Sequence, residues 1–115
     1  MPEMYYEPWR CCVDLVRHMW RFYCLHRDAD ASEMKPAARR SWTACKAVWD
    51  SMTQSEREIM RVCHTQSVSS GGHMAAAERY AAQHRVRVED VMTVVFRCYK
   101  QTALIRGIAD AGDQE

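Results

Sequence analysis

Apolar residues recur at helical spacing along the N-terminal part of the chain. Counting from Trp9, they return at offsets of 4, 7, 11 and 14 residues, which places them on one face of a helix. They are Trp9, Val13, Val16, Trp20 and Tyr23. A second apolar line widens that face to more than half of the circumference: Cys12, Leu15, Met19 and Phe22. Proline suits the first position of a helix, so we predict a helix that begins at Pro8 and needs covering on two sides.

The next two helices are separated by a capping signal. A polar loop over residues 28–35 precedes Pro36, which again suits a helix start. The helix predicted from there has one apolar face, formed by Ala38, Trp42, Cys45, Trp49 and Met52. Thr53 and Glu56 then match the capping-box spacing, in which a hydroxyl and a carboxylate satisfy amides that have no helical partner. They predict the end of this helix and the start of a short third helix with Ile59, Met60, Val62 and Cys63 as its apolar residues.

Two further helices are predicted in the C-terminal half. Residues 65–72 are rich in serine and glycine and form a connector. A fourth helix over 73–84 places four apolar or small residues inward: Met74, Ala77, Tyr80 and Ala81. After a short break, a fifth helix runs over 88–106 and ends at Gly107. The alternation of arginine and valine over 85–88 also allows a short strand.

Composition favours the same architecture. Glycine and proline together number 4 + 3 = 7 residues of 115, whereas all-β folds need such residues at frequent turns. The hydrophobic share of 48% disfavours disorder, and the length suits one hydrophobic core. We therefore expect an all-α protein, a single compact domain of about five helices over residues 1–115. Its parts are an N-terminal helical pair (8–52), a helix-turn-helix-like part (53–107) and a frayed acidic tail (108–115).

The C-terminal half carries a resemblance to a known family. Helix, loop, short helix, tight break and long helix follow one another over 52–106, as in a helix-turn-helix unit. Residues 52–61, MTQSEREIMR, resemble the opening of the sigma factor region-four family. Tyr80 and Ala81 match the apolar residue and the alanine at which two helices of that family cross closely. In that family the last helix enters the DNA major groove, so the resemblance implies a DNA-binding regulator of transcription.

The resemblance also assigns roles around the break. It implies that Val86 plugs the turn and that Val91 and Val94 hold the last helix against the core. Two positions depart from the family pattern. His84 occupies a slot that is normally apolar, and Arg85 stands where glycine usually turns the chain.

If the last helix meets duplex DNA, its outward residues and those of the turn make the contacts. The candidate nucleic-acid-binding residues are Arg85, Arg87, Thr93, Arg97 and Lys100. Base edges and phosphates are bound by such donors and hydroxyls. Glu89 and Asp90 would face phosphates in the same region, which is an electrostatic mismatch.

An apolar line on the same helix supports a different hypothesis. It consists of Val88, Met92, Phe96 and Tyr99, at offsets of 4, 8 and 11 residues. If the N-terminal helices cover this line, the helix is a central strut of the core. If it is exposed, it binds a protein partner or a second copy, because methionine and aromatic residues are enriched in interfaces. The protein would then be an inhibitor or adaptor of a nucleic-acid-processing enzyme, with a homodimer as one form.

The net charge of +1 conceals a segregated distribution. Residues 31–106 carry +5, the first thirty residues carry −1 and the tail carries −3. The basic stretch can supply several phosphate contacts, and solvated helix faces are the alternative interpretation.

Motifs for catalysis and metal binding are missing from the sequence. It contains no phosphate-binding glycine loop, no Gly-x-Ser-x-Gly elbow and no His-Glu-x-x-His pair. The six cysteines have no Cys-x-x-Cys spacing and lie in apolar helical patterns, so we expect buried, reduced thiols. Nothing resembles a signal peptide or a membrane span. We expect a cytoplasmic protein that is not an enzyme, uses no cofactor or metal, binds no membrane and has no evident small-molecule substrate.

Overall fold

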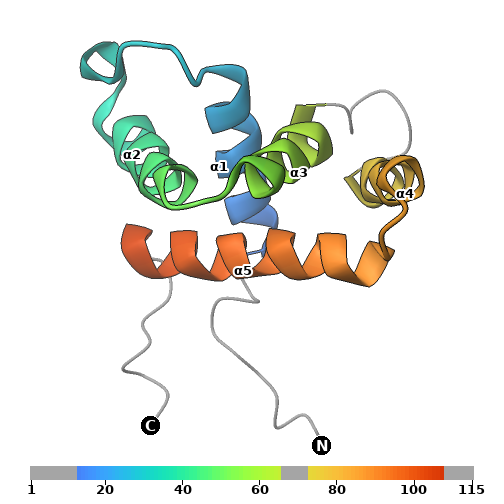
Figure 1. The fold of residues 1–115 in the computed structure, drawn as a ribbon. Helices are drawn as coiled ribbons and strands as arrows, with labels where there is room; N and C mark the ends of the chain where they lie inside the picture. Colours follow the sequence, from blue (N-terminus) through green and yellow to red (C-terminus); the bar gives the residue numbers. More distant parts are fainter. Residues whose placement is uncertain (1–12, 66–72, 108–115) are drawn as a thin grey trace, which may run out of the picture.

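The structure is a computed structural model that describes residues 13–65 and 73–107 (Figure 1). In chain order its elements are α1 (Val13–Leu25), the 3₁₀ turn η3 (Ala31–Glu33), α2 (Pro36–Asp50), α3 (Gln54–Thr65), α4 (His73–His84) and α5 (Val88–Arg106). These ranges hold five α-helices and no strand, so the all-α prediction is confirmed. The alternative of a strand before the last helix is wrong, because Val88 already begins α5. The predicted start at Pro8, most of the connector and the acidic tail lie outside the described residues.

The helix ends have local chemical causes. Pro36 occupies the first turn of α2, as predicted. At the start of α3, the backbone N–H of Thr53 donates to Oε1 of Glu56 (2.9 Å), and the backbone N–H of Glu56 donates to Oγ1 of Thr53 (3.2 Å). This reciprocal pair is the predicted capping box. Gly107 ends α5 with a φ of 85°, in the left-handed region that glycine adopts without strain.

Helix α5 runs along one side of the molecule, and α2, α3 and α4 lie on its inner side (Figure 1). All four of the other α-helices pack against α5. Helix α1 packs against α2, α3 and α5 in turn. The sequence predicted that α1 needs covering on two sides, and three neighbouring helices cover it.

Trp20 of α1 lies at the centre of the core. Its side chain is fully buried, and its ring stands edge-on to that of Tyr23, with centroids 5.6 Å apart. The indole nitrogen donates to Oγ1 of Thr102 on α5 (2.9 Å), and this hydroxyl donates to the carbonyl of Cys98 (2.7 Å). A buried indole N–H needs such a partner, because it has lost its hydration. The bond therefore favours one register of α1 against α5.

The cysteines behave as small hydrophobic side chains. Cys45, Cys63 and Cys98 are buried, Cys24 is half-buried, and all four are free thiols. Burial raises the pKa of the Cys24 thiol to about 12 and those of Cys63 and Cys98 to about 11. These thiols are therefore protonated at neutral pH, which makes them unreactive. The first two cysteines of the sequence lie outside the described residues.

Two apolar residues that the periodicity placed inward are exposed. Leu15 and Met74 are 53% and 44% exposed. In α1 the buried face centres on Val16 and Trp20, so Leu15 lies about a quarter turn away from it. In α4 the burial begins at Ala76, and Met74 lies roughly half a turn around the helix from that residue.

Candidate functional site

The turn between α4 and α5 is a left-handed helix cap built on Arg85. Arg85 has a φ of 57°, and the backbone N–H of Val86 donates to the carbonyl of Ala81 (3.0 Å), as in a Schellman motif. Glycine usually occupies such a position because a β-carbon is strained there. The chain reversal directs Val86 outward, where it is 45% exposed. The prediction that Val86 plugs the turn is therefore wrong.

The residues predicted to join the last two helices are mostly buried. Tyr80, Ala81 and Val91 are buried, and Val94 is half-buried against the core. His84 stays at the surface, where its ring stacks on that of Tyr80 with centroids 3.9 Å apart. The Tyr80 ring therefore provides an apolar contact for position 84, and the polar edge of the histidine ring remains in contact with water.

The inner side of α5 is filled with buried residues: Val91, Val95, Cys98, Tyr99, Thr102 and Ala103. Tyr99 is fully buried, and its hydroxyl lies 2.5 Å from Nε2 of His64 on α3. Nδ1 of His64 lies 2.7 Å from the carbonyl of Met60, which only accepts hydrogen bonds. Nδ1 therefore carries the hydrogen of this bond, and Nε2 forms a second hydrogen bond with the Tyr99 hydroxyl. Tyr99 is a core residue, so its assignment to a partner-binding surface is wrong.

The rest of the apolar line also turns toward the core. Val88, Met92 and Phe96 are half-buried and pack against the hydrophobic cluster. The ring of Phe96 stands edge-on to that of Tyr99, with centroids 6.0 Å apart. Helix α5 is therefore apolar on two adjoining sides because its neighbours surround it, and most of this line acts in packing.

The outer strip of α5, which we define as Thr93, Arg97, Lys100 and Gln101, is exposed. The hydroxyl of Thr93 donates to the backbone carbonyl of Glu89 (2.8 Å). Arg97 reaches α3, where its Nη2 lies 2.6 Å from Oε2 of Glu56, and 46% of its side chain remains exposed. Three of the four residues were predicted as nucleic-acid-binding. Gln101 was missed, although it lies one helical turn after Arg97.

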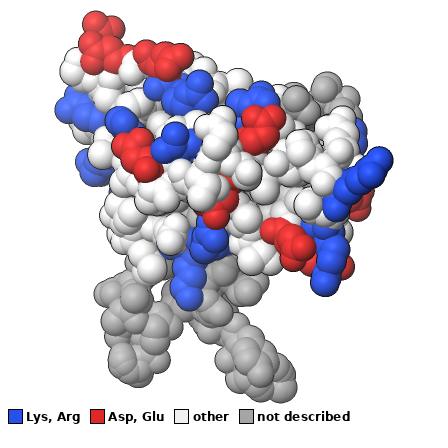
Figure 2. Space-filling view, viewed as in Figure 1, with Lys and Arg blue, Asp and Glu red and all other residues white. Residues whose placement is uncertain are grey.

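The other predicted contacts lie around the turn that precedes this strip. Arg85 and Arg87 are exposed, and Nε of Arg87 lies 3.6 Å from Oε1 of Glu89. Glu89 and Asp90 stand in the first turn of α5, where carboxylates interact favourably with the helix dipole. Figure 2 shows one face of the molecule, on which basic and acidic side chains are interspersed between uncharged areas. That face therefore carries no extended field of one sign.

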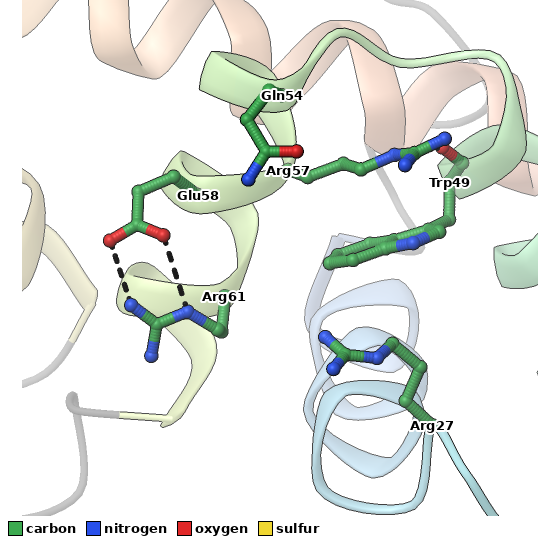
Figure 3. A pocket seen from close by; sticks show the side chains of 6 residues that line it. All are labelled: Arg27, Trp49, Gln54, Arg57, Glu58 and Arg61. Atoms are coloured by element: carbon green, nitrogen blue, oxygen red, sulfur yellow. Dashed lines mark hydrogen bonds and ion pairs between the residues drawn. The ribbon is translucent and has the colours of Figure 1, made fainter.

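A cleft of about 420 Å³ opens where the end of α1 meets the α2–α3 junction. We call it the arginine cleft, and it is lined by Arg27, Trp49, Gln54, Arg57, Glu58 and Arg61 (Figure 3). The guanidinium carbons of Arg27 and Arg57 lie 5.1 and 5.6 Å from the centroid of the Trp49 ring. The two groups approach the ring from opposite sides (Figure 3). Such cation–π contacts hold the arginines in place.

Hydrogen bonds fix the other side chains of the arginine cleft. Nε of Arg57 donates to the carbonyl of Trp49 (2.9 Å), which ties α3 to the end of α2. Arg61 binds both carboxylate oxygens of Glu58, at 2.7 and 3.4 Å. No pattern in the sequence indicates this cleft. The periodicity placed Trp49 in the core, whereas its ring is only half-buried and lies against Arg27.

A second, smaller cleft lies between α2 and the end of α5. Its volume is about 270 Å³, and its lining residues are Arg39, Arg40, Thr43, Ala44, Ile105 and Arg106. Arg39 donates to the carbonyls of Ala31 and Met34 (3.1 and 3.0 Å), so its guanidinium holds η3 in place. Arg39 accordingly has a structural role in the fold.

No group of three or more His, Cys, Asp or Glu side chains in residues 13–65 and 73–107 is arranged to hold a metal ion. None of the helices described is long and apolar enough to cross a lipid bilayer.

Comparison of the chain with protein-family models, with curated proteins and with solved structures finds no match.

Proposed function

We propose that this protein is a non-enzymatic regulator that binds duplex DNA through the outer strip of α5 and the turn before it. One observation carries this proposal. The apolar line of α5 turns toward the core, so the exposed residues of its middle turns, Thr93, Arg97, Lys100 and Gln101, present hydroxyl, amide and cationic groups. These are the groups that bind base edges and phosphates.

The placement of charge supports the same surface. Arg85 and Arg87 are exposed at the turn, and Arg97 and Lys100 follow along the helix. Residues 31–106 carry +5 in total. Because the acidic residues stand in the first turn of α5, the contact with phosphates is centred on its later turns and on the preceding loop.

The test is a mobility shift on duplex DNA as a function of salt. The variant Arg87→Gln/Arg97→Gln/Lys100→Gln is expected to abolish the shift, because each lost phosphate contact lowers the salt slope by about 0.9. A matched control removes three cationic charges from α2 and the residue before it: Lys35→Gln, Arg40→Gln and Lys46→Gln. It is expected to bind nearly as the parent does. Absence of binding at low salt, or an equal loss in the control, would refute the proposal.

A second candidate function is binding of a protein, as an inhibitor or adaptor of a nucleic-acid-processing enzyme. The observation that favours it is that Met92 and Phe96 are only half-buried, beside the outer strip. Sedimentation measures self-association, which Met92→Glu should weaken while circular dichroism shows an intact helical fold. A monomer at every concentration would remove the homodimer from consideration.

A further inference from the structure

We infer that the arginine cleft binds the phosphate group of a small phosphorylated molecule. Three arginines from three parts of the chain line it, with Arg27 and Arg57 on opposite sides of the Trp49 ring, against a single carboxylate (Figure 3). The lining therefore carries an excess of positive charge, which attracts an anion. The site shares no residue with the surface proposed for DNA.

The arginines of the cleft retain capacity to bind. Within residues 13–65 and 73–107, no carboxylate forms an ion pair with Arg27, whose side chain rests on Trp49. Arg57 and Arg61 each have N–H groups beyond those used in the bonds described above. Guanidinium groups match the oxygens of a phosphate geometrically, so an exposed guanidinium such as that of Arg27 favours this anion.

Glu58 should make the cleft selective among anions. Its carboxylate lines the cleft and is 39% exposed. A carboxylate accepts a hydrogen bond from the hydroxyl of a protonated phosphate, whereas it repels sulfate, which carries no hydrogen at neutral pH. The site should therefore prefer phosphate to sulfate, although the two anions have the same shape.

The volume of the cleft indicates a ligand larger than phosphate alone. It measures about 420 Å³, whereas one water molecule takes about 30 Å³ in the liquid. A phosphate therefore leaves room for a small organic group esterified to it. The amide of Gln54 and the edge of Trp49 line this remaining space (Figure 3).

The experiment uses the full chain with inorganic phosphate, sulfate and glycerol 3-phosphate as probes. Titration calorimetry at about pH 6, where about half of a phosphate monoester still carries a hydrogen, measures the affinity. The indole N–H signal of Trp49 reports the place of binding. We expect saturable one-to-one binding with the order glycerol 3-phosphate, phosphate, sulfate. Arg27→Gln should weaken the binding about tenfold, the usual effect of losing one charge-assisted hydrogen bond. The matched control Arg40→Gln, an exposed arginine on α2, should leave it unchanged.

A further variant tests the role of the carboxylate. Glu58→Gln should reduce the preference for phosphate over sulfate, because the amide no longer repels sulfate. Absence of saturable binding, equal affinity for both anions in the parent, or an equal loss in Arg40→Gln would each overturn the inference.

The outcome is separable from that of the proposed function. The triple variant of Arg87, Arg97 and Lys100 should bind glycerol 3-phosphate as the parent does, and Arg27→Gln should keep its affinity for DNA. If duplex DNA displaces glycerol 3-phosphate, the cleft belongs to the DNA contact and the separate site is refuted.

Discussion

The two sides of α5 differ in how their polar groups are satisfied. On the inner side, Tyr99 and Thr102 are buried and hydrogen-bond to partners on α3 and α1. On the outer side, Arg97 and Thr93 are exposed. Arg97 pairs with Glu56 and Thr93 donates to the carbonyl of Glu89, and water can replace either partner. Similar chemical groups therefore stabilise the fold on the inner side of α5 and are available to a ligand on its outer side. Substitutions on the inner side should therefore change the free energy of unfolding, and those on the outer side should change binding.

The largest effect is expected for Tyr99→Ala on the inner side. Removing a buried aromatic ring leaves a cavity and typically costs about 3–5 kcal/mol of unfolding free energy. Urea denaturation measures the change. Tyr99→Phe keeps the ring and loses only the hydroxyl bond to His64, so it should cost about 1 kcal/mol. A loss below about 1 kcal/mol for the alanine variant would contradict the burial of this side chain.

Thr102→Val should have an intermediate effect. The valine keeps the shape but leaves the buried indole N–H of Trp20 without its acceptor, which costs about 1–3 kcal/mol. The matched control on the outer side is Thr93→Val, which should change the unfolding free energy by less than about 0.5 kcal/mol. Equal losses in these two variants would show that the two sides do not differ as described.

Glu56 connects the capping box of α3 to the outer strip, and its effect should depend on pH. The Thr53 backbone N–H and Arg97 hold the pKa of this carboxyl below its ordinary value. Its contribution is therefore present above the ordinary pKa and is lost as the pH falls through the lowered pKa. We expect the unfolding free energy of the parent to exceed that of Glu56→Gln by up to about 1 kcal/mol at neutral pH, because glutamine keeps the capping box but loses the ion pair with Arg97. This gap should close in acid. Denaturation of both proteins across this pH range measures the gap, and a constant difference would exclude the ionised carboxylate as its cause.

Glu89→Gln should have the smallest effect on stability and a positive effect on binding. It removes an exposed carboxylate from the first turn of α5, which costs less than about 1 kcal/mol. Arg87 loses its partner and becomes available to a phosphate, so the salt slope of DNA binding should steepen by about 0.9. Glu33→Gln, an exposed acid on η3, is the control. If both variants or neither bind DNA more tightly, the acid at the start of α5 does not limit binding.

Predictions from the sequence succeeded where the cause is local. The helix starts at Pro36 and Thr53 and the stop at Gly107 follow from ring geometry, a capping box and a left-handed cap, which involve neighbours in the chain. Predictions failed where they depended on which side chains the neighbouring helices bury. Val86 and Leu15 have the right residue type for a core, but the chain reversal at Arg85 and the placement of the neighbouring helices expose them.

The arginine cleft could not be predicted for the same reason. Arg27 follows α1, Trp49 lies near the end of α2, and Arg61 is on α3, so no spacing along the chain links them. Trp49 fits the apolar face of its helix, and only the packing of α1 and α3 leaves its ring half-buried between two guanidinium groups. The sites that use groups from several helices are thus the ones that require the fold.

The order of residues along the chain is enough to predict that this protein is all-α, where α2 and α3 begin and where α5 ends. Helical periodicity and caps are properties of adjacent residues, so they are readable without the fold. The tertiary structure alone decided that the apolar line of α5 packs inward, that Tyr99 belongs to the core, and that three arginines share one cleft. Each of these depends on which helix covers which face, and that choice is made by contacts between segments far apart in the chain.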